Sequence, residues 1–335
     1  MASTVTQAFA DFIKDPIRLD SNDNDQAKIS RDNLIKQISK FPEDGSFPTL
    51  HSSIPSIDFG SFSRKTKHRP LDDIDTMIVL HGQGATYWEE GNKITLTNDL
   101  NASHFRDLCN PATNVLNSIK FVNKFKDYLG KVHHYKKADI HRDGEAVRLE
   151  LDSYDWSFDI VPAFETKVNS AGKSYFVIPD GKGDWKFTDP RLDKARVQRV
   201  NSLHTISVLD MIRMAKYWNN RPTMPSMGSY LMENLVLDYF QNTPVALVHK
   251  TYPYCMSDVL DYISTHVYYG VNDPKGIQGN LNKLSWEDMH KISDRAASDS
   301  KKAKLAIAHD LNGNQRLAIE TWGQIFGSKF PLFTY

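Results

Sequence analysis

Apolar residues recur at helical spacing through most of the second half of the chain. They do so in residues 203–218, 229–240, 256–270 and 285–311. The first 45 residues show the same pattern, interrupted by the polar stretch DSNDNDQ, and so do residues 111–130, where Gly130 is the expected C-cap. This pattern predicts an N-terminal helical segment, one helix within the first half and a helical second half.

Strand patterns occupy the region between these helices. IDFGS at 57–61 predicts a short strand that ends in a Gly-Ser turn, and DIDTMIVL at 73–80 predicts a strand entering the core. ADIHRDGEAVRLEL at 138–151 predicts a hairpin, because an Asp-Gly pair supplies the positive φ angles of a tight turn. WSFDIVPAF at 156–164 predicts a further strand, stopped by Pro162, and residues 174–190 predict a second hairpin around two glycines.

The chain therefore divides into a strand-bearing first part and a helical second part, which predicts an α+β protein of two lobes. We expect the boundary near residue 200, with domains 1–200 and 201–335. At 335 residues, with 40% hydrophobic and 24% charged residues, the composition is that of an ordinary soluble globular protein. No internal repeat or long low-complexity linker is visible.

Charge and cysteine content narrow the function. Lysine plus arginine equals aspartate plus glutamate at 41 each, so no whole-protein field would attract a long nucleic acid. Two cysteines are too few for a disulfide framework or a thiolate zinc site, which favours a reducing cytoplasm. The absence of a leader pattern and of a long apolar run favours a cytoplasmic protein with no membrane association.

Two aspartates on the strand at 73–80 carry the strongest chemical signal. Asp73 and Asp75 leave the same face, while Ile74 points into the core. A bare Asp-x-Asp also fits a solvated strand end, but the apolar TMIVL run indicates an interior strand, where unpaired charges are costly. Mg²⁺ would offset that cost, and Asp159 is the third candidate ligand. Three carboxylates can hold two metal ions about 4 Å apart, an arrangement used for displacement at phosphorus.

Gly60 and Ser61 precede this strand. Glycine allows close approach of backbone or ligand, and the N–H groups of such a turn, with a serine hydroxyl, suit phosphate oxygens. An ordinary turn is the alternative. The basic residues that follow, Arg64, Lys65, Lys67, His68 and Arg69, have no assignable role from the sequence, and Asp72 is expected to face away from the metals by strand alternation.

Together these motifs resemble a known family. GSFSRKT, the DID pair with eleven residues between Ser61 and Asp73, and FDIVPAF are similar to the nucleotidyltransferase signature of the DNA polymerase β superfamily. The likeness is closest to oligoadenylate synthetase, cyclic GMP-AMP synthase and their bacterial relatives, the CD-NTases of anti-phage signalling. MIRMAKYWN, SYLMENL and AIETWGQIFGSKFP resemble further blocks of the bacterial enzymes, so the likeness covers nearly the whole chain.

The resemblance implies a bilobed polymerase-β-like core with a mixed sheet at 1–200, braced by the N-terminal helix, and a C-terminal helical lobe at 201–335, with the active site in the cleft. It implies that Asp73, Asp75 and Asp159 are catalytic and bind two Mg²⁺ ions, with Mn²⁺ as an alternative. Residues implied to bind nucleotide are Gly60, Ser61 and Lys216 at the triphosphate, with Ser229, and Tyr230 under a base. From the residues alone, Lys216 could be an exposed helix lysine and Tyr230 a core residue.

The implied reaction joins NTPs, ATP and a second NTP such as GTP, with release of pyrophosphate, into a cyclic di- or trinucleotide second messenger. A downstream effector would sense the product, and a partner protein is a candidate activator. The alternatives are a superfamily member acting on RNA ends, protein or antibiotic, and a nucleotide-binding regulator without catalysis. The lysine- and histidine-rich stretch from Lys120 to Arg142 is either a solvated face or a surface for an activating nucleic acid. The pair His133-His134 lacks ligand partners at metal-binding spacing.

Overall fold

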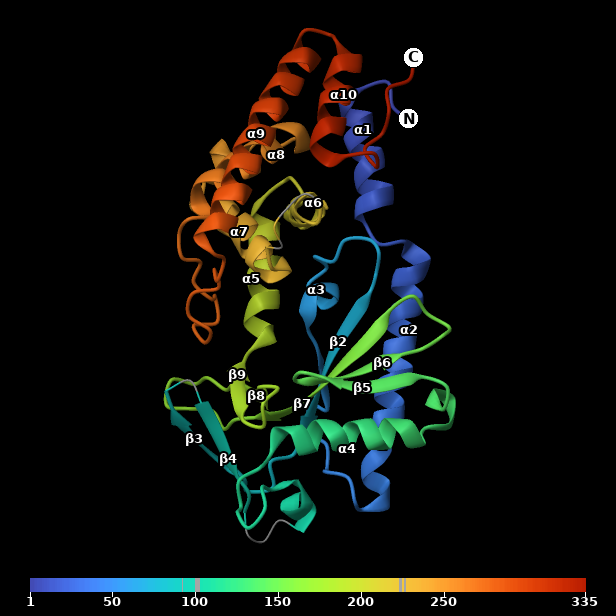
Figure 1. The fold of residues 1–335 in the computed structure, drawn as a ribbon, viewed down its shortest axis with the longest axis vertical. Helices are drawn as coiled ribbons and strands as arrows, with labels where there is room; N and C mark the ends of the chain where they lie inside the picture. The colour runs from blue at the N-terminus through green and yellow to red at the C-terminus, as the bar shows by residue number, and fades with distance from the viewer. Residues whose placement is uncertain (92, 100–102, 223–224, 226) are drawn as a thin grey trace. The chain divides into compact units, whose positions relative to one another are not determined.

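The computed structural model describes residues 1–335 except 92, 100–102, 223, 224 and 226 (Figure 1). By its contacts the chain forms two compact units, each assembled from segments distant in sequence. We call Ser21–Ser63 with Leu71–Arg191 the sheet unit, and Met1–Asp20, Arg64–Pro70 and Leu192–Tyr335 the helical unit. The sequence-based division at residue 200 treats each domain as one continuous stretch, and it stays a prediction.

The sheet unit confirms the strands and hairpins expected from the sequence and adds two strands. Its strands are β1 (Ser56–Asp58), β2 (Asp73–Leu80), β3 (Thr86–Glu90), β4 (Lys93–Thr97), β5 (Asp139–Asp143), β6 (Ala146–Glu150), β7 (Ser157–Glu165), β8 (Phe176–Pro179) and β9 (Trp185–Thr188). The added strands, β3 and β4, pair with each other and β4 joins β9. All five residues of β3 are exposed, so the apolar alternation that identifies a half-buried strand is missing there.

The strands form one mixed sheet in the order β1-β2-β7-β8-β9-β4-β3, with β6 and β5 branching from β7. β2 and β7 run parallel, from Asp73 beside Ser157 to Leu80 beside Phe164, and the remaining described pairs are antiparallel. The parallel pair brings the amino ends of β2 and β7 together. This confirms the α+β fold with a mixed sheet.

Pro162 does not end β7, contrary to the sequence-based expectation. β6 pairs with β7 as far as Ile160, and β8 takes over at Phe164, so Pro162 lies between these two partners. On the other side of β7 it faces Ile78 of the parallel strand. A proline is tolerated in a strand where its missing N–H is not needed for the ladder, and the gap between β6 and β8 is such a place.

Helices α2 (Ser21–Ile38), α3 (Gly60–Ser63) and α4 (Ser118–Lys131) belong to the sheet unit, and α4 packs against β5, β6, β7 and β8 (Figure 1). α4 begins after Asn117, whose side chain accepts a hydrogen bond from the Lys120 amide. Gly130 is not the C-cap as expected but lies inside the helix. The last turn ends at Val132 in an extended conformation, which requires no left-handed residue.

Aromatic and aliphatic side chains fill the two faces of the sheet. Phe121 of α4 packs its ring edge against Phe164 and Trp185, at centroid distances of 5.5 and 5.3 Å. A second cluster on β2 and β7 includes Met77, Val79, Val161 and Ala163, all buried. By strand alternation this second face is also the face of Asp75 and Asp159, so apolar packing fixes the strands on which the acids stand.

The helical unit confirms the helical second half. It contains α1 (Val5–Phe12), a π-helix (Ile13–Ile17), most of α5 (Pro190–Leu203), and then α6 (Val208–Asn219), α7 (Ser229–Asn242), α8 (Tyr252–His266), α9 (Trp286–Leu311) and α10 (Gln315–Phe326). The polar stretch after residue 19 opens α2, so the N-terminal helical segment is shared between the two units. Among the described residues, no helix combines the length and the apolar character needed to cross a membrane.

Candidate functional site

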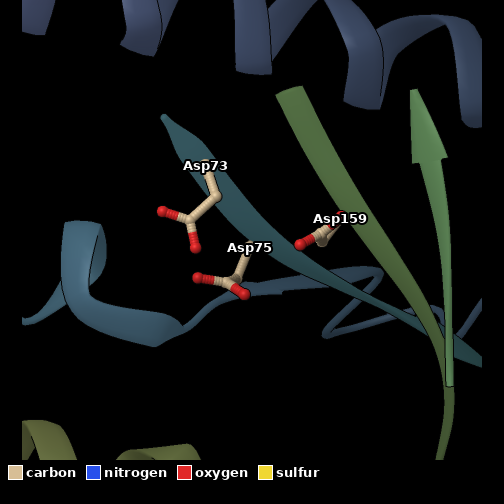
Figure 2. A group of neighbouring side chains, drawn as sticks. All are labelled: Asp73, Asp75 and Asp159. Carbon is tan, nitrogen blue, oxygen red and sulfur yellow. The ribbon is translucent and has the colours of Figure 1, made fainter. Parts of the chain in front are cut away.

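The parallel strands β2 and β7 place three carboxylates together at their amino ends. Asp73 and Asp75 stand two residues apart on β2, and Asp75 is directly beside Asp159 in the register of β7. One ligand oxygen from each of the three residues lies within 4.8 Å of the others. Figure 2 shows the three side chains converging from the two strands. The fold therefore brings Asp159 beside Asp73 and Asp75, more than eighty residues earlier in the chain, as predicted.

One carboxylate oxygen of the half-buried Asp159 lacks a hydrogen bond. Its Oδ1 is buried and has no hydrogen-bond donor in the described structure, and Nη1 of Arg148 lies 3.9 Å away. Burial raises the pKa of Asp159; Arg148 opposes this shift, and the negative charge of Asp73 adds to it. An uncompensated carboxylate oxygen beside two further carboxylates fits a hard divalent cation.

Gly60 lies directly against Asp75. Its φ is +69°, and a Cβ placed on it would be 1.7 Å from Oδ2 of Asp75, a distance that no real side chain can adopt. The amide N–H of Phe59 also donates to the carbonyl of Asp75 at 3.3 Å. The expected Gly-Ser turn is the first turn of the four-residue helix α3, so Gly60 and Ser61 belong to a helical turn packed onto β2.

Lys216 of α6 is buried, with 2% of its surface exposed, so it is not the exposed helix lysine that the sequence left open. Its Nζ donates to Oε2 of Glu233 at 2.7 Å, and it lies 3.3 and 3.4 Å from the carbonyl and the hydroxyl of Thr66. Burial alone would raise the pKa of Glu233, but Lys216 and Arg64 outweigh it and lower the pKa to about 2. Sequence reasoning missed Glu233, because its partners are 17, 167 and 169 positions away.

Tyr230 and Ser229 open α7. Ser229 is exposed, and Tyr230 is half-buried rather than a full core residue. The Tyr230 hydroxyl donates to Oδ1 of Asp193 at 2.6 Å and accepts from Nζ of Lys275 at 2.6 Å. Burial, followed by the charge of Asp193, raises the pKa of Tyr230, so the phenol stays protonated. Lys275 and Asp193 were not anticipated from the sequence.

The predicted residues thus fall into two groups. The three aspartates, Gly60 and Ser61 lie in the sheet unit, whereas Lys216, Ser229 and Tyr230 lie in the helical unit. Within the described part of the chain, the aspartate trio is the one group of acids, histidines or cysteines within ligand distance, and His133-His134 is not part of it. That all eight residues serve one active site stays a prediction.

Comparisons with known proteins agree with this geometry. No protein-family profile matches the chain. A protein named probable cyclic nucleotide synthase from Bacillus cereus (strain VD146) is 45% identical over 336 residues, covering 99% of this chain and 99% of its own.

Among solved structures, Escherichia coli CdnC with ATP superposes with a TM-score of 0.70 at 16% identity, over 97% of this chain and 98% of that one. Vibrio cholerae DncV in its apo form gives a TM-score of 0.67 at 12% identity, over 96% of each chain. The structural likenesses concern the fold, and the full-length identity to the Bacillus protein shows that this chain belongs to the bacterial cyclic nucleotide synthases, the CD-NTases.

Proposed function

We propose that the protein joins nucleoside triphosphates and closes them into a cyclic di- or trinucleotide. In each step a ribose hydroxyl of one nucleotide forms a bond to the α-phosphorus of the other, the bond to the β-phosphate oxygen breaks, and pyrophosphate leaves with the hydroxyl proton passing to solvent. The observation that carries this proposal is the trio Asp73, Asp75 and Asp159, held on parallel strands with ligand oxygens within 4.8 Å of one another. The name of the Bacillus relative supports the cyclic product.

Asp73, Asp75 and Asp159 would hold Mg²⁺, with Mn²⁺ as an alternative. The hydrogen-bond deficit at Oδ1 of Asp159 supports this assignment. When bound, two Mg²⁺ ions would neutralise charge on the triphosphate and favour the ionised form of the attacking hydroxyl. The chain itself supplies position: Gly60 leaves room for the Asp75 carboxylate, and the apolar residues of β2 and β7 keep the carboxylates in register.

The remaining residues would bind the nucleotides. Gly60 and Ser61 would contact the triphosphate of the donor, together with Lys216 and Ser229, and the ring of Tyr230 would stack on a base. The hydrogen bonds from Tyr230 to Asp193 and from Lys275 to Tyr230 support the last role, because they fix the orientation of the ring. The structure of CdnC with ATP supports ATP as one substrate.

The setting we propose is anti-phage signalling in the cytoplasm, in which a downstream effector senses the cyclic product. A complex of E. coli CdnC with a HORMA protein has been solved, which supports a partner protein as a candidate activator of this chain as well. Among the described residues, the basic stretch from Lys120 to Arg142 shows no contact that favours a nucleic-acid activator over a solvated face.

The test is incubation of the purified protein with all four radiolabelled NTPs and Mg²⁺, followed by phosphatase treatment and mass spectrometry. We expect a phosphatase-resistant product with the mass of two or three linked nucleotides, and none from an Asp73→Asn, Asp75→Asn variant. Label on RNA, on protein or on an added aminoglycoside, without a small cyclic product, would instead support the alternative superfamily activities. Cellular function that survives the double substitution would indicate a non-catalytic regulator.

A further inference from the structure

Glu233 on α7 is the centre of a buried ionic network. Its side chain is 1% exposed, and its two oxygens accept four hydrogen bonds. Arg64 binds the carboxylate in a bidentate manner: Nε donates to Oε1 at 2.6 Å and Nη2 donates to Oε2 at 3.2 Å. Oε2 also accepts from the Thr66 hydroxyl at 2.8 Å and from Lys216 at 2.7 Å. One carboxylate therefore ties a basic segment to two helices.

Lys216 completes this network from α6. Its ammonium group carries three N–H bonds, and three acceptors surround it: Oε2 of Glu233, the Thr66 carbonyl and the Thr66 hydroxyl. In this arrangement every hydrogen of Lys216 has a protein acceptor. Lys216 therefore holds the backbone at Thr66, and contact with a triphosphate would exchange one of these acceptors for a phosphate oxygen.

The gripped segment, Arg64–Pro70, occupies a special place in the chain. It belongs to the helical unit by its contacts, although Ser63 before it and Leu71 after it belong to the sheet unit. It is the covalent connection between α3, which contains Gly60 and Ser61, and β2, which begins at Asp73. Arg213 of α6 holds the same segment, with Nε donating to the Lys67 carbonyl at 3.1 Å.

Alone, the segment would not be expected to keep this conformation. Lys65 has a φ of +60°, a left-handed angle that costs a residue with a Cβ on the order of 1 kcal/mol. Its two neighbours, Arg64 and Thr66, are the residues that Glu233 holds. Strain at Lys65, flanked on both sides by residues that Glu233 holds, indicates that the conformation is imposed by the network.

We propose that Glu233 is a positioning residue for nucleotidyl transfer, which acts by fixing the Arg64–Thr66 connection between the triphosphate-binding turn and the metal-binding strand. The proposal rests on the function proposed above. Its carboxylate acts through Arg64, Thr66 and Lys216, and it does not touch the reacting atoms. The net positive charge that remains on Arg64 and Lys216, two cations against one carboxylate, also suits a segment that adjoins a polyanionic substrate.

A purely structural carboxylate in the same unit supplies the matched control. Asp299 of α9 is fully buried, accepts from Nε1 of Trp218 at 3.0 Å and pairs with Arg295 and Lys302, each at 2.8 Å. Arg221 lies 3.6 Å from it as well, so Asp299 has three charged partners against two for Glu233, but none of them is in the Arg64–Pro70 segment. Glu233→Gln and Asp299→Asn therefore each replace a carboxylate by an amide. In Glu233 this carboxylate holds the Arg64–Pro70 segment, whereas in Asp299 it holds helices packed against each other.

The experiment measures kcat and KM for Mg-ATP, by pyrophosphate release, in the full-length wild type, Glu233→Gln and Asp299→Asn. Rates are taken well below each Tm and normalised to folded protein by circular dichroism. We expect kcat/KM to fall at least tenfold in Glu233→Gln and less than twofold in Asp299→Asn, with a lowered Tm in both. Equal values of kcat/KM for the two variants, or a higher apparent ATP affinity in Glu233→Gln, would overturn the proposal.

Thr66→Val provides a second test of the proposal, for use if Glu233→Gln fails to fold. It removes the hydroxyl that donates to Glu233 and accepts from Lys216, and it leaves all charges in place, so we expect a folded protein with a roughly threefold lower kcat/KM. An unchanged kcat/KM for Thr66→Val would then count against the role of Glu233. A wild-type protein that releases no pyrophosphate from any NTP would refute the proposed function itself, which separates the two failures.

Discussion

Gly60→Ala should strongly lower activity by displacing Asp75, one of the proposed metal ligands. The new methyl group would lie 1.7 Å from Oδ2, 2.4 Å from Cγ and 2.9 Å from Cβ of Asp75. Non-bonded heavy atoms settle near 3.5 Å, so the Asp75 carboxylate and the Gly60 backbone must separate by roughly 1.5 Å or more. All three clashing atoms belong to one short side chain on a buried strand, and rotation of its terminal carboxylate alone cannot clear the clash at Cβ.

The size of the effect follows from this displacement. Misplacing a catalytic group by about 1 Å costs roughly a hundredfold in rate, so we expect kcat/KM to fall by about a hundredfold or more. The left-handed φ of +69° adds a separate penalty of about 1–2 kcal/mol in the free energy of unfolding, because alanine carries a Cβ. The loss of activity should therefore far exceed the loss of stability.

Gly45→Ala separates the two effects. Gly45 lies in the same unit with a φ of +72°, and a Cβ there would meet nothing within 4 Å. It should lose the same 1–2 kcal/mol or so of stability and keep wild-type kcat/KM. The assays are pyrophosphate release from Mg-ATP and unfolding in urea. If Gly60→Ala stayed within threefold of Gly45→Ala in kcat/KM, the argument that Asp75 needs its present position would be wrong.

Three further predictions concern charge and packing. Asp159→Asn should lower product formation by about a hundredfold while leaving Tm equal to or above that of the wild type, because it removes a buried carboxylate oxygen without a hydrogen bond; differential scanning fluorimetry checks the second half. The pKa of Glu233 is lowered from 4.5 to about 2, so its ionised form stabilises the fold fully above pH 4.5 and loses that contribution, roughly 3 kcal/mol, as the pH falls from 4.5 toward 2. Urea unfolding across this range should show a steeper loss of stability in wild type than in Glu233→Gln, and parallel curves would contradict the assignment. Phe12→Ala should lower the free energy of unfolding by about 3–5 kcal/mol, since its fully buried ring packs 4.7 Å from Phe326 and 5.1 Å from Phe330; a loss below 1 kcal/mol would contradict this packing.

The sequence predicts best where one local pattern decides the structure. DIDTMIVL became β2 with the expected bounds, because its apolar run and flanking turns leave few alternatives. The aspartates were predictable for the same reason, since acidic residues on a strand stand out against apolar neighbours. The C-terminal helices follow from their spacing. In these places local pattern and tertiary structure agree.

Prediction from the sequence fails where residues distant in the chain determine the local structure. Pro162 sits inside β7 because β6 and β8 leave a gap there, which depends on the whole sheet. Glu233 looks like an ordinary helix residue until the fold brings Arg64 and Thr66 to it. The requirement for glycine at position 60 arises from Asp75, which approaches from another element. Exposed strands such as β3 carry no burial pattern at all.

The N-terminal segment of the helical unit packs against residues that the ribosome synthesises about 310 positions later. The amide of Val5 bonds the side chain of Gln315, 310 positions later, and Phe9 packs on Trp322 with ring centroids 4.8 Å apart. At about 5–20 residues per second, the first helix waits roughly 15–60 s for these partners to be synthesised. The sheet unit is complete by Arg191, so it can fold first. The nascent chain thus carries an unburied apolar helix through most of its synthesis, and chaperone binding to nascent α1 should end only when α10 has emerged.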